Sequence, residues 1–209
     1  LFNQPLGNSL DNCTKLTHIH FCCEFNQQLT NSLDNCTVLT HINFGWYFNQ
    51  PLDNSLNNCT ALTHIKFGSC FNQPLNNLIS NFKFLTHLGL GRGFNQKVDL
   101  PLKLRSLSLN SNNGNLTDYL PDSIEELELG PDFNLELNNL PSSIKKITFN
   151  KYSMYNKELN CLPTGLSILQ LPPVYKQQIQ SIPKSLTKLI CSKKYKYIND
   201  FSGIEVETY

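Results

Sequence analysis

Imidazole is the side chain best suited to proton transfer or metal binding near neutral pH, and the five histidines of this 209-residue sequence recur in one short motif. His18, His41, His64 and His87 recur with a constant period of 23, and His20 is the second residue after the first of them. If each motif forms one strand of a parallel sheet, neighbouring rings of the four stand about 5 Å apart. Such a row could ligate a divalent metal or contact a partner. It could also be a surface residue copied with its repeat, which is the interpretation that we favour. In a row of this kind, we expect mutual repulsion to lower the pKa of the inner histidines.

The histidine motif belongs to a repeat that runs through the whole sequence. In the first half, Phe-Asn recurs with a period of 23 from Phe2 to Phe94, and the frames LTHIHF, LTHINF, LTHIKF and LTHLGL lie between these pairs. In the second half, Leu-Pro or Ile-Pro recurs with a period of 20–22 from Leu100 to Ile182, and each pair precedes a frame of the form LxxLxL. The nine frames begin at Leu16, Leu39, Leu62, Leu85, Leu104, Ile124, Ile144, Leu166 and Leu186.

These frames predict a leucine-rich-repeat solenoid. The second and third apolar residues of each frame alternate with period two, which is typical of a short strand with one buried face. A strand this short cannot hold a core alone, so the repeats must stack into a parallel sheet. The connections are short and rich in Pro, Asn and Ser, which predicts irregular or 3-10 turns on the convex side and few or no long helices. We expect one solenoid of about nine repeats over residues 1–209: period-23 repeats in 1–99, period 20–22 in 100–196, and a C-terminal cap or tenth strand in 197–209.

The 34 leucines and 27 asparagines of the sequence divide between two structural roles. Leucine lines the interior of the stacked strands. One asparagine recurs in each coil, where its amide can satisfy backbone groups of adjacent coils, while the phenylalanine beside it fills the interior. Asn115 fits the same ladder with a shortened turn. The other predicted ladder residues are Asn3, Asn26, Asn49, Asn72, Asn95, Asn134 and Asn156.

The stretch LPDSIEELELGPDFNLEL at 120–137 resembles the FNIP repeat, a leucine-rich-repeat subclass found mainly in social amoebae and giant DNA viruses. LPSSIKKITFNKYSMYN from Leu140 and LPTGLSILQL from Leu162 are weaker copies, and SLDNCTKL with FNQPL is a variant in the first half. Several proteins of this family join the repeats to an F-box, which implies substrate recognition for ubiquitin ligation. FNQPL is also similar to bacterial surface leucine-rich repeats, although their WD-x-S-N-V-T core is absent here.

The cysteines do not form a disulfide or metal framework. Cys13, Cys36 and Cys59 recur with the same period of 23, and the equivalent position in the fourth repeat is Phe82, which indicates an apolar buried site. Eight cysteines without paired spacing favour a reducing compartment, so we expect a cytoplasmic protein, in the host cytoplasm if it is viral. N-glycosylation motifs at Asn12, Asn35, Asn58 and Asn115 leave an extracellular adhesion protein as the alternative.

Composition and motifs exclude several classes of function. A net charge of +1 does not suit a nucleic-acid binder. The sequence has no run of 18 apolar residues, which is the length that a membrane-spanning helix needs. No catalytic constellation is present, so we expect neither enzyme activity nor a cofactor. The expected function is a non-enzymatic scaffold that binds a protein through its concave face, with Glu126 and Lys146 pairing across neighbouring strands. The candidate binding residues on that face are His18, His20, His41, Asn43, His64, Lys66, His87, Ser106, Ser108, Glu126, Glu128, Lys146 and Lys188.

Overall fold

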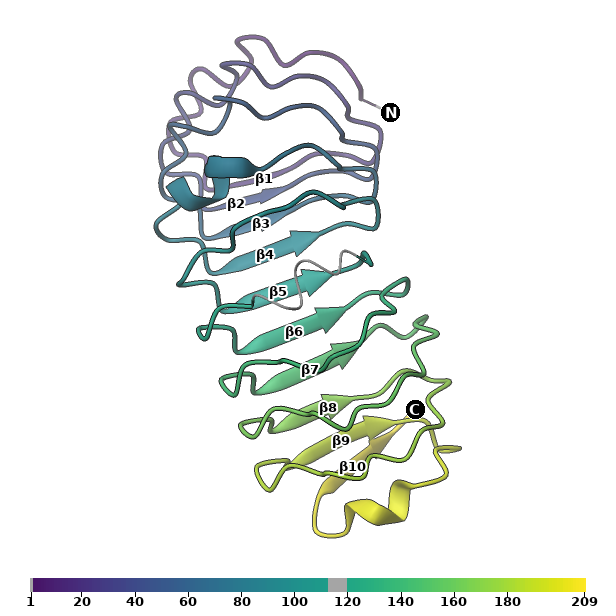
Figure 1. Cartoon of the computed structure of the whole chain (residues 1–209). Coiled ribbons are helices and arrows are strands. Elements are labelled where there is room, and N and C mark those ends of the chain that lie inside the picture. The colour runs from purple at the N-terminus through teal and green to yellow at the C-terminus, as the bar shows by residue number, and fades with distance from the viewer. Residues whose placement is uncertain (1, 113–119) are drawn as a thin grey trace. The chain divides into compact units, whose positions relative to one another are not determined.

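A computed structural model describes residues 2–112 and 120–209 of the chain, without the side chains of residues 76 and 77 (Figure 1). Every one of the nine predicted frames holds a strand, and β10 follows them in the C-terminal segment. The strands are β1 (His18–His20), β2 (His41–Asn43), β3 (His64–Lys66), β4 (His87–Leu90), β5 (Ser106–Leu109), β6 (Glu126–Leu129), β7 (Lys146–Phe149), β8 (Ile168–Gln170), β9 (Lys188–Cys191) and β10 (Glu205–Thr208).

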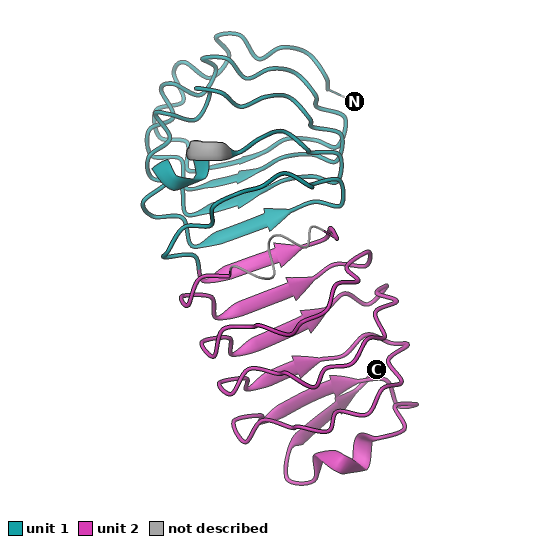
Figure 2. Ribbon diagram, in the orientation of Figure 1, with its two compact units in different colours: residues 1–104 teal, residues 105–209 magenta. Residues whose placement is uncertain are grey.

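The chain divides into two compact units, residues 1–104 and 105–209 (Figure 2). In the first unit, β1 to β4 pair in sequence order and in parallel, with His41 beside His64 and Ile42 beside Ile65. In the second unit, β5 to β10 also pair in sequence order and in parallel. The predicted parallel solenoid is therefore confirmed.

Turns and extended segments form the rest of the coils. Helical geometry in the described ranges is limited to two short 3-10 segments, η1 (Asn76–Asn81) and η2 (Ile198–Phe201). No helix in the described part of the chain is long and apolar enough to cross a membrane.

Two phenylalanine columns fill the interior of the first unit. Phe25, Phe48, Phe71 and Phe94 are all fully buried, and their rings stack in parallel with 6.1–6.2 Å between successive centroids. A second column consists of the residues that directly follow β1, β2 and β3, namely Phe21, Phe44 and Phe67. Their ring centroids lie 4.1–4.6 Å from those of the first column. The prediction of an aromatic column inside the coils is confirmed, and offset stacking of such rings adds to the free energy of burial.

The asparagine ladder of the first unit joins each coil to the next through one repeated hydrogen bond. The backbone N–H of Asn49 donates to Oδ1 of Asn26 over 2.9 Å, and the N–H of Asn72 donates to Oδ1 of Asn49 over the same distance. Asn3 and Asn95 continue the pattern at the two ends. The ladder is half-buried at the surface of the coil, so it satisfies backbone donors that would otherwise be partly removed from water.

In the second unit the ladder is less regular than the sequence suggests. The backbone N–H of Asn134 donates to Oδ1 of Asn112 over 2.6 Å, so Asn112 occupies the position that we assigned to Asn115. Asn115 itself lies outside the described residues. Asn156 is a ladder residue as predicted, but its Oδ1 accepts from the backbone N–H of Lys176, because the next coil has no asparagine at that position.

We expect Asn49→Ala to lower the free energy of unfolding by about 1–2 kcal/mol, because the backbone N–H of Asn72 loses its acceptor. Gln73 also donates its Nε2 to the side-chain oxygen of Asn49 over 3.1 Å, and this bond is lost as well. Urea denaturation followed by circular dichroism measures the loss. Asn49→Asp is the matched control, since it keeps an oxygen at the same place and should retain most of the stability. Equal losses in the two variants would contradict the ladder.

The C-terminal segment forms both of the structures that the sequence left open. Phe201, at the end of η2, is buried beside the ring of Tyr195. β10 then pairs along the whole of β9. The hydroxyl of Tyr209 donates to the backbone oxygen of Leu171 over 2.6 Å. The segment therefore adds a strand to the sheet and covers the last apolar coil with Phe201.

Candidate functional site

The candidate site is the open sheet face, defined as the strand side chains that point away from the core. Buried and exposed residues alternate along each strand, as in β6, where Leu127 and Leu129 are buried and Glu126 and Glu128 are exposed. Because the described strand pairs within each unit are parallel and in register, equivalent side chains of successive strands in a unit form straight columns. Every predicted binding residue lies on this face.

The histidine column, composed of His18, His41, His64 and His87, is the most regular feature of the face. Successive rings lie 4.1, 4.0 and 3.9 Å apart between centroids, with interplanar angles of 12–15°. The column follows from the repeat period, since the four residues are register partners on adjacent strands. His20 lies outside it, in a second column with Asn43, Lys66 and Gly89.

A threonine column beside the histidines determines which ring nitrogen carries the proton. The hydroxyl of Thr63 donates to the backbone oxygen of Thr40 over 3.1 Å, and Nδ1 of His64 lies 2.8 Å from the same hydroxyl oxygen. A hydroxyl has one proton to give, so Nδ1 of His64 must be the donor to Thr63. His41 and His87 have the same arrangement with their own threonines. The neutral rings therefore present Nε2 outward as unprotonated hydrogen-bond acceptors.

The stacking geometry opposes a metal site within the histidine column. A zinc ion sits about 2.0–2.1 Å from a ring nitrogen, along a lone pair that lies in the ring plane. Neighbouring rings of the column are nearly parallel, with centroids 4.0 and 3.9 Å apart, so their Nε2 lone pairs run side by side and do not converge. In the described part of the chain, no group of three or more His, Cys, Asp or Glu side chains is arranged to hold a metal ion.

Partial burial and neighbouring imidazoles lower the pKa values of the inner histidines. For His64, desolvation is the larger cause, the charges of His87, His41 and His18 add to it, and the pKa falls from 6.5 to about 4. The pKa of His41 is lowered by the same two causes. Around pH 7 these two rings are neutral, so each of them offers its Nε2 as a hydrogen-bond acceptor.

The low pKa of His64 predicts a loss of stability in acid. Between about pH 6.5 and pH 4 the unfolded chain protonates His64 while the folded chain does not, so the unfolded state binds more protons. The contribution of this residue is therefore present above pH 6.5 and is lost as the pH falls towards 4. NMR titration of the His64 ring should give a midpoint near 4, and the urea midpoint of unfolding should fall over the same range.

His87→Gln is the control for this titration, because it removes the largest charge neighbour of His64 and leaves most of the burial. The midpoint of His64 should rise in this variant but stay below 6.5. A His64 midpoint near 6.5 in the unmodified chain would contradict the stacked geometry.

The second unit presents a mixed-charge version of the same face. One column contains Ser106, Glu126, Lys146, Ile168, Lys188 and Glu205, and the other contains Ser108, Glu128, Thr148, Gln170, Ile190 and Glu207. A hollow of about 270 Å³ lies on the face between β5 and β7, and Ser106, Glu126, Glu128, Lys146 and Thr148 line it.

One electrostatic prediction for this face needs correction. Glu126 and Lys146 are register partners as expected, but the ion pair forms one residue earlier, between Glu125 and Lys145 at 3.2 Å. Glu125 also lies 3.4 Å from Arg105, so it bridges two coils. These pairs are exposed to solvent, and pairs of this kind contribute little to stability.

Lys188, which we predicted as a binding residue, is already engaged within the chain. Its Nζ lies 2.8 Å from Glu207 and 2.9 Å from Glu205, both on β10. The hydrogen bond from Lys188 to Glu207 is the largest cause of a raised pKa for this lysine, and the hydrogen bond to Glu205 is the second. Lys188 therefore fastens β10 to β9. The two glutamates were missed, because the sequence did not establish that 205–208 is a strand of this sheet.

Two of the three predicted column cysteines, Cys36 and Cys59, are buried, whereas Cys13 in the first coil is only half-buried. Cys36 and Cys59 are fully buried, and Phe82 occupies the equivalent position in the fourth coil. Burial raises the pKa of the Cys59 thiol to about 12, so this group stays protonated and behaves as a small apolar side chain.

In two of the three glycosylation motifs next to these cysteines, the asparagine amide forms a hydrogen bond within the fold. The side-chain nitrogens of Asn35 and Asn58 donate to the backbone oxygens of Asp11 and Asp34, over 3.0 and 3.3 Å. These nitrogens are the atoms that would carry a glycan. The fourth motif, at Asn115, lies outside the described residues.

Three repeated positions escaped the sequence interpretation although each recurs visibly with the period of the first half. The threonines before the histidines set the tautomer, and the glutamines of each FNQ motif reinforce the asparagine ladder, as Gln50 and Gln73 do. Gly45, Gly68 and Gly91 form a column in which a Cβ would overlap the backbone oxygen of the preceding coil.

Part of the chain is similar to a known repeat, and most of it is similar to a solved structure. Residues 113–152 and 155–194 match the family model described as FNIP Repeat. The chain is also similar to CroV588, a giant-virus protein whose crystal structure is described as a novel circular LRR protein structure, with 29% identity and a TM-score of 0.66. The alignment covers 87% of this chain and 31% of that protein, so the chain spans about a third of the length of CroV588. No curated protein matches the sequence.

Proposed function

The chain is a leucine-rich-repeat-type solenoid that carries FNIP repeats, and from this fold we propose that it is a non-enzymatic scaffold that binds a protein partner through its open sheet face. The observation that carries the proposal is the set of in-register columns of polar side chains on this face. Short strands fixed by hydrogen bonds on both sides hold these groups before a partner arrives, which lowers the entropy cost of binding.

The two units offer different chemistry to a partner. The first presents the row of Nε2 acceptors together with Asn43 and Lys66, and none of the strands β1 to β4 contains an acidic residue. The second presents Glu126, Glu128 and Lys146 around its hollow. A ligand of the first unit would donate hydrogen bonds to its acceptors, and a ligand of the second unit would place a basic group near its glutamates.

Site-specific photo-crosslinking tests the proposed surface. A benzophenone side chain at Lys66 or Glu128 lies on the open sheet face, whereas the same group at Thr60 or Gln180 is exposed elsewhere on the coil. In extract of the source cells, benzophenone at Lys66 and at Glu128 should crosslink to the same discrete protein. An excess of the chain without benzophenone should reduce the yield of this crosslink. Crosslinks that are equal at all four positions, or that occur only at Thr60 and Gln180, would contradict the proposal.

A more specific proposal is that the solenoid is the substrate-recognition part of an F-box-type ubiquitin-ligase adaptor. Its support is the resemblance of the repeats to those of the FNIP family. In cells that express the full-length protein, ubiquitination of the crosslinked partner should then depend on the open sheet face. If ubiquitination were unchanged in the double variant Glu126→Lys with Glu128→Lys, the adaptor role would be contradicted. The scaffold proposal would then still be tested by the crosslinking experiment.

We also propose a reducing, cytoplasmic environment. All eight cysteines are free thiols, including the exposed Cys23 and Cys161. The amides of Asn35 and Asn58 serve the fold in the unmodified form. Intact-mass analysis of protein from the source cells should find neither glycans nor disulfides. A glycan at Asn35 or Asn58 would support the adhesion alternative in its place.

A further inference from the structure

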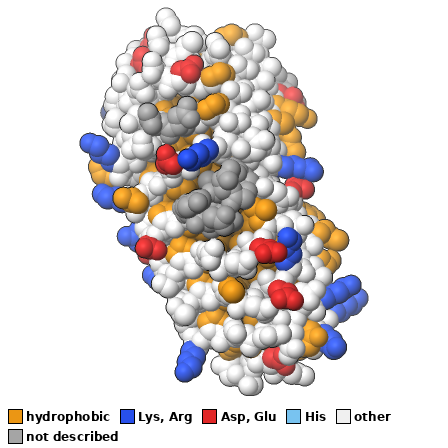
Figure 3. Space-filling view, in the orientation of Figure 1, with side chains coloured by type: hydrophobic (Ala, Val, Ile, Leu, Met, Phe, Trp, Pro, Cys, Tyr) orange, Lys and Arg blue, Asp and Glu red, His pale blue; other side chains and the backbone are white. Residues whose placement is uncertain are grey.

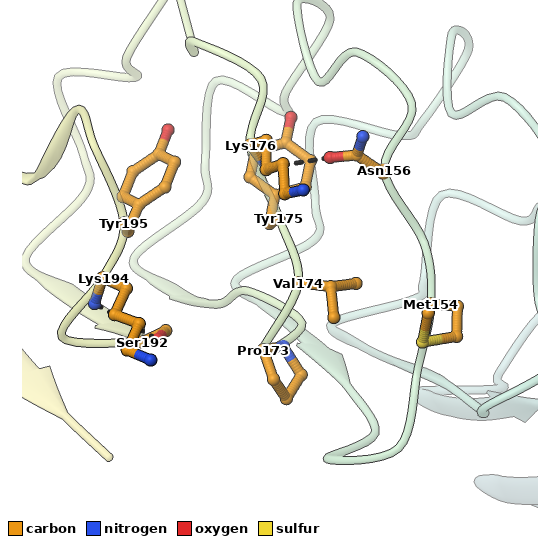
Figure 4. Close-up of a pocket in the computed structure, with 9 residues that line it drawn as sticks. All are labelled: Met154, Asn156, Pro173, Val174, Tyr175, Lys176, Ser192, Lys194 and Tyr195. Atoms are coloured by element: carbon orange, nitrogen blue, oxygen red, sulfur yellow. Dashed lines mark hydrogen bonds between the residues drawn. The ribbon is translucent and has the colours of Figure 1, made fainter.

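A groove of about 500 Å³ lies in the second unit, on the turns that follow β7, β8 and β9 (Figure 4). Successive coils contribute to it: Met154 follows β7, Pro173 and Val174 follow β8, and Lys194 follows β9. These turns are separate from the open sheet face, so the groove does not belong to the surface of the proposed scaffold function.

The floor of the groove is apolar and accessible. Met154 is 72% exposed, and Pro173 and Val174 are half-exposed beside it. Single apolar side chains are common on protein surfaces, but a contiguous apolar strip with a polar rim is typical of an interaction site.

The rim of the groove is positively charged. Residues 151–197 contain eight lysines and a single acidic residue, Glu158, and both Lys176 and Lys194 line the groove. Within the described residues, no acidic side chain lines it, and Glu158 instead accepts a hydrogen bond from Asn160 over 2.7 Å. Figure 3 shows basic and hydrophobic side chains at the lower right-hand edge of the molecule, with acidic side chains nearby. The charge on this rim is therefore not neutralised within the groove.

Hydrogen bonds and buried rings hold the groove in shape. The backbone N–H of Lys176 donates to Oδ1 of Asn156 over 2.8 Å, as Figure 4 shows. Tyr175 and Tyr195 are each only 4% exposed, and the hydroxyl of Tyr195 donates to the backbone oxygen of Gln177 over 2.9 Å. A partner thus meets a preformed surface, which is the usual condition of a binding site.

We propose that this groove binds an extended acidic segment of a partner protein. Its carboxylates pair with Lys176 and Lys194, and one of its apolar side chains rests on Met154, Pro173 and Val174. Three coils at about 4.8 Å each span roughly 10 Å, which corresponds to about three extended residues of the bound segment.

The composition of the groove favours a peptide over a nucleic acid. Bases bind single-stranded sites by stacking on exposed aromatic faces. The tyrosines that line this groove are buried in the coil, and the accessible floor consists of a methionine, a proline and a valine. Aliphatic side chains of this kind suit a leucine or phenylalanine of a partner.

Fluorescence anisotropy with a labelled peptide Asp-Glu-Leu-Phe-Asp-Glu tests the proposal on the whole chain. Binding should weaken at least tenfold in the double variant Lys176→Glu with Lys194→Glu. The matched control, Lys103→Glu with Lys184→Glu, makes the same change in net charge at exposed lysines that do not line the groove, and its affinity should change less than threefold. Circular dichroism verifies that both variants are folded.

Two further probes examine the apolar floor and the class of ligand. Met154→Ser should weaken the Leu-Phe peptide at least threefold and leave the affinity of a Gly-Gly version unchanged. A ten-residue oligothymidylate should bind at least tenfold more weakly than the peptide. No binding of the peptide, equal weakening in both lysine pairs, or tighter binding of the oligothymidylate would each overturn the proposal.

Discussion

Phe48→Ala is expected to lower the free energy of unfolding of the first unit by about 3–5 kcal/mol, the usual cost of removing a buried phenylalanine ring. Phe48 is fully buried, and its ring centroid lies 6.2 Å from that of Phe25, 6.1 Å from that of Phe71 and 4.4 Å from that of Phe44. The stacked coils on both sides prevent the cavity from collapsing, because their spacing is set by the sheet. The loss therefore includes both the transfer of the ring and the empty space.

Urea denaturation followed by circular dichroism gives this difference. Phe84→Ala is the matched control, since Phe84 is 61% exposed and its truncation should change the free energy of unfolding by less than about 0.5 kcal/mol. If Phe48→Ala cost no more than Phe84→Ala, the phenylalanine column could not be the core of the first unit.

Gly68→Ala is the second change with a large expected effect, about 3 kcal/mol, at the upper end of the cost of overpacking. A Cβ at Gly68 would overlap the backbone oxygen and carbonyl carbon of Gly45 in the preceding coil. No rotamer change relieves a contact with backbone, so the two coils must separate. Separation strains the asparagine ladder and the phenylalanine column at the same time.

Gly89→Ala distinguishes this effect from a general intolerance of alanine. The nearest atom to a Cβ at Gly89 is Cγ of Lys66 at 3.0 Å, and this flexible side chain can move aside. Thermal unfolding should therefore show a large decrease in Tm for Gly68→Ala and a small one for Gly89→Ala. Equal decreases would mean that the close approach of Gly68 to the preceding coil does not limit the spacing of the coils.

The repeat predicted the fold of this protein almost completely because solenoid structure is local. Each LxxLxL frame contains its own strand signal, and a constant period places equivalent residues in register when coils stack. The histidine column follows directly, since His41 and His64 are one period apart in a sheet whose register advances by one repeat. Even its lowered pKa values were predicted in direction from the expected spacing.

Partner choice at the surface could not be predicted in the same way. Glu125 and Glu126 face Lys145 and Lys146 at the same offset in sequence, so the spacing alone allows either ion pair. The pair that forms involves Glu125, which precedes the strand and also reaches Arg105. Which carboxylate is used depends on where each side chain leaves the coil.

By itself, the sequence determined the nine frames, their parallel stacking, the buried cysteines and the resemblance to FNIP repeats. Tertiary structure decided that Asn112 joins the ladder and that Lys188 is bound by the glutamates of β10. It also placed Met154 beside Val174 in a lysine-rimmed groove. The physical reason is that burial and register repeat with the period of the chain, whereas the partner of an individual polar or exposed side chain depends on where irregular turns of different length bring it.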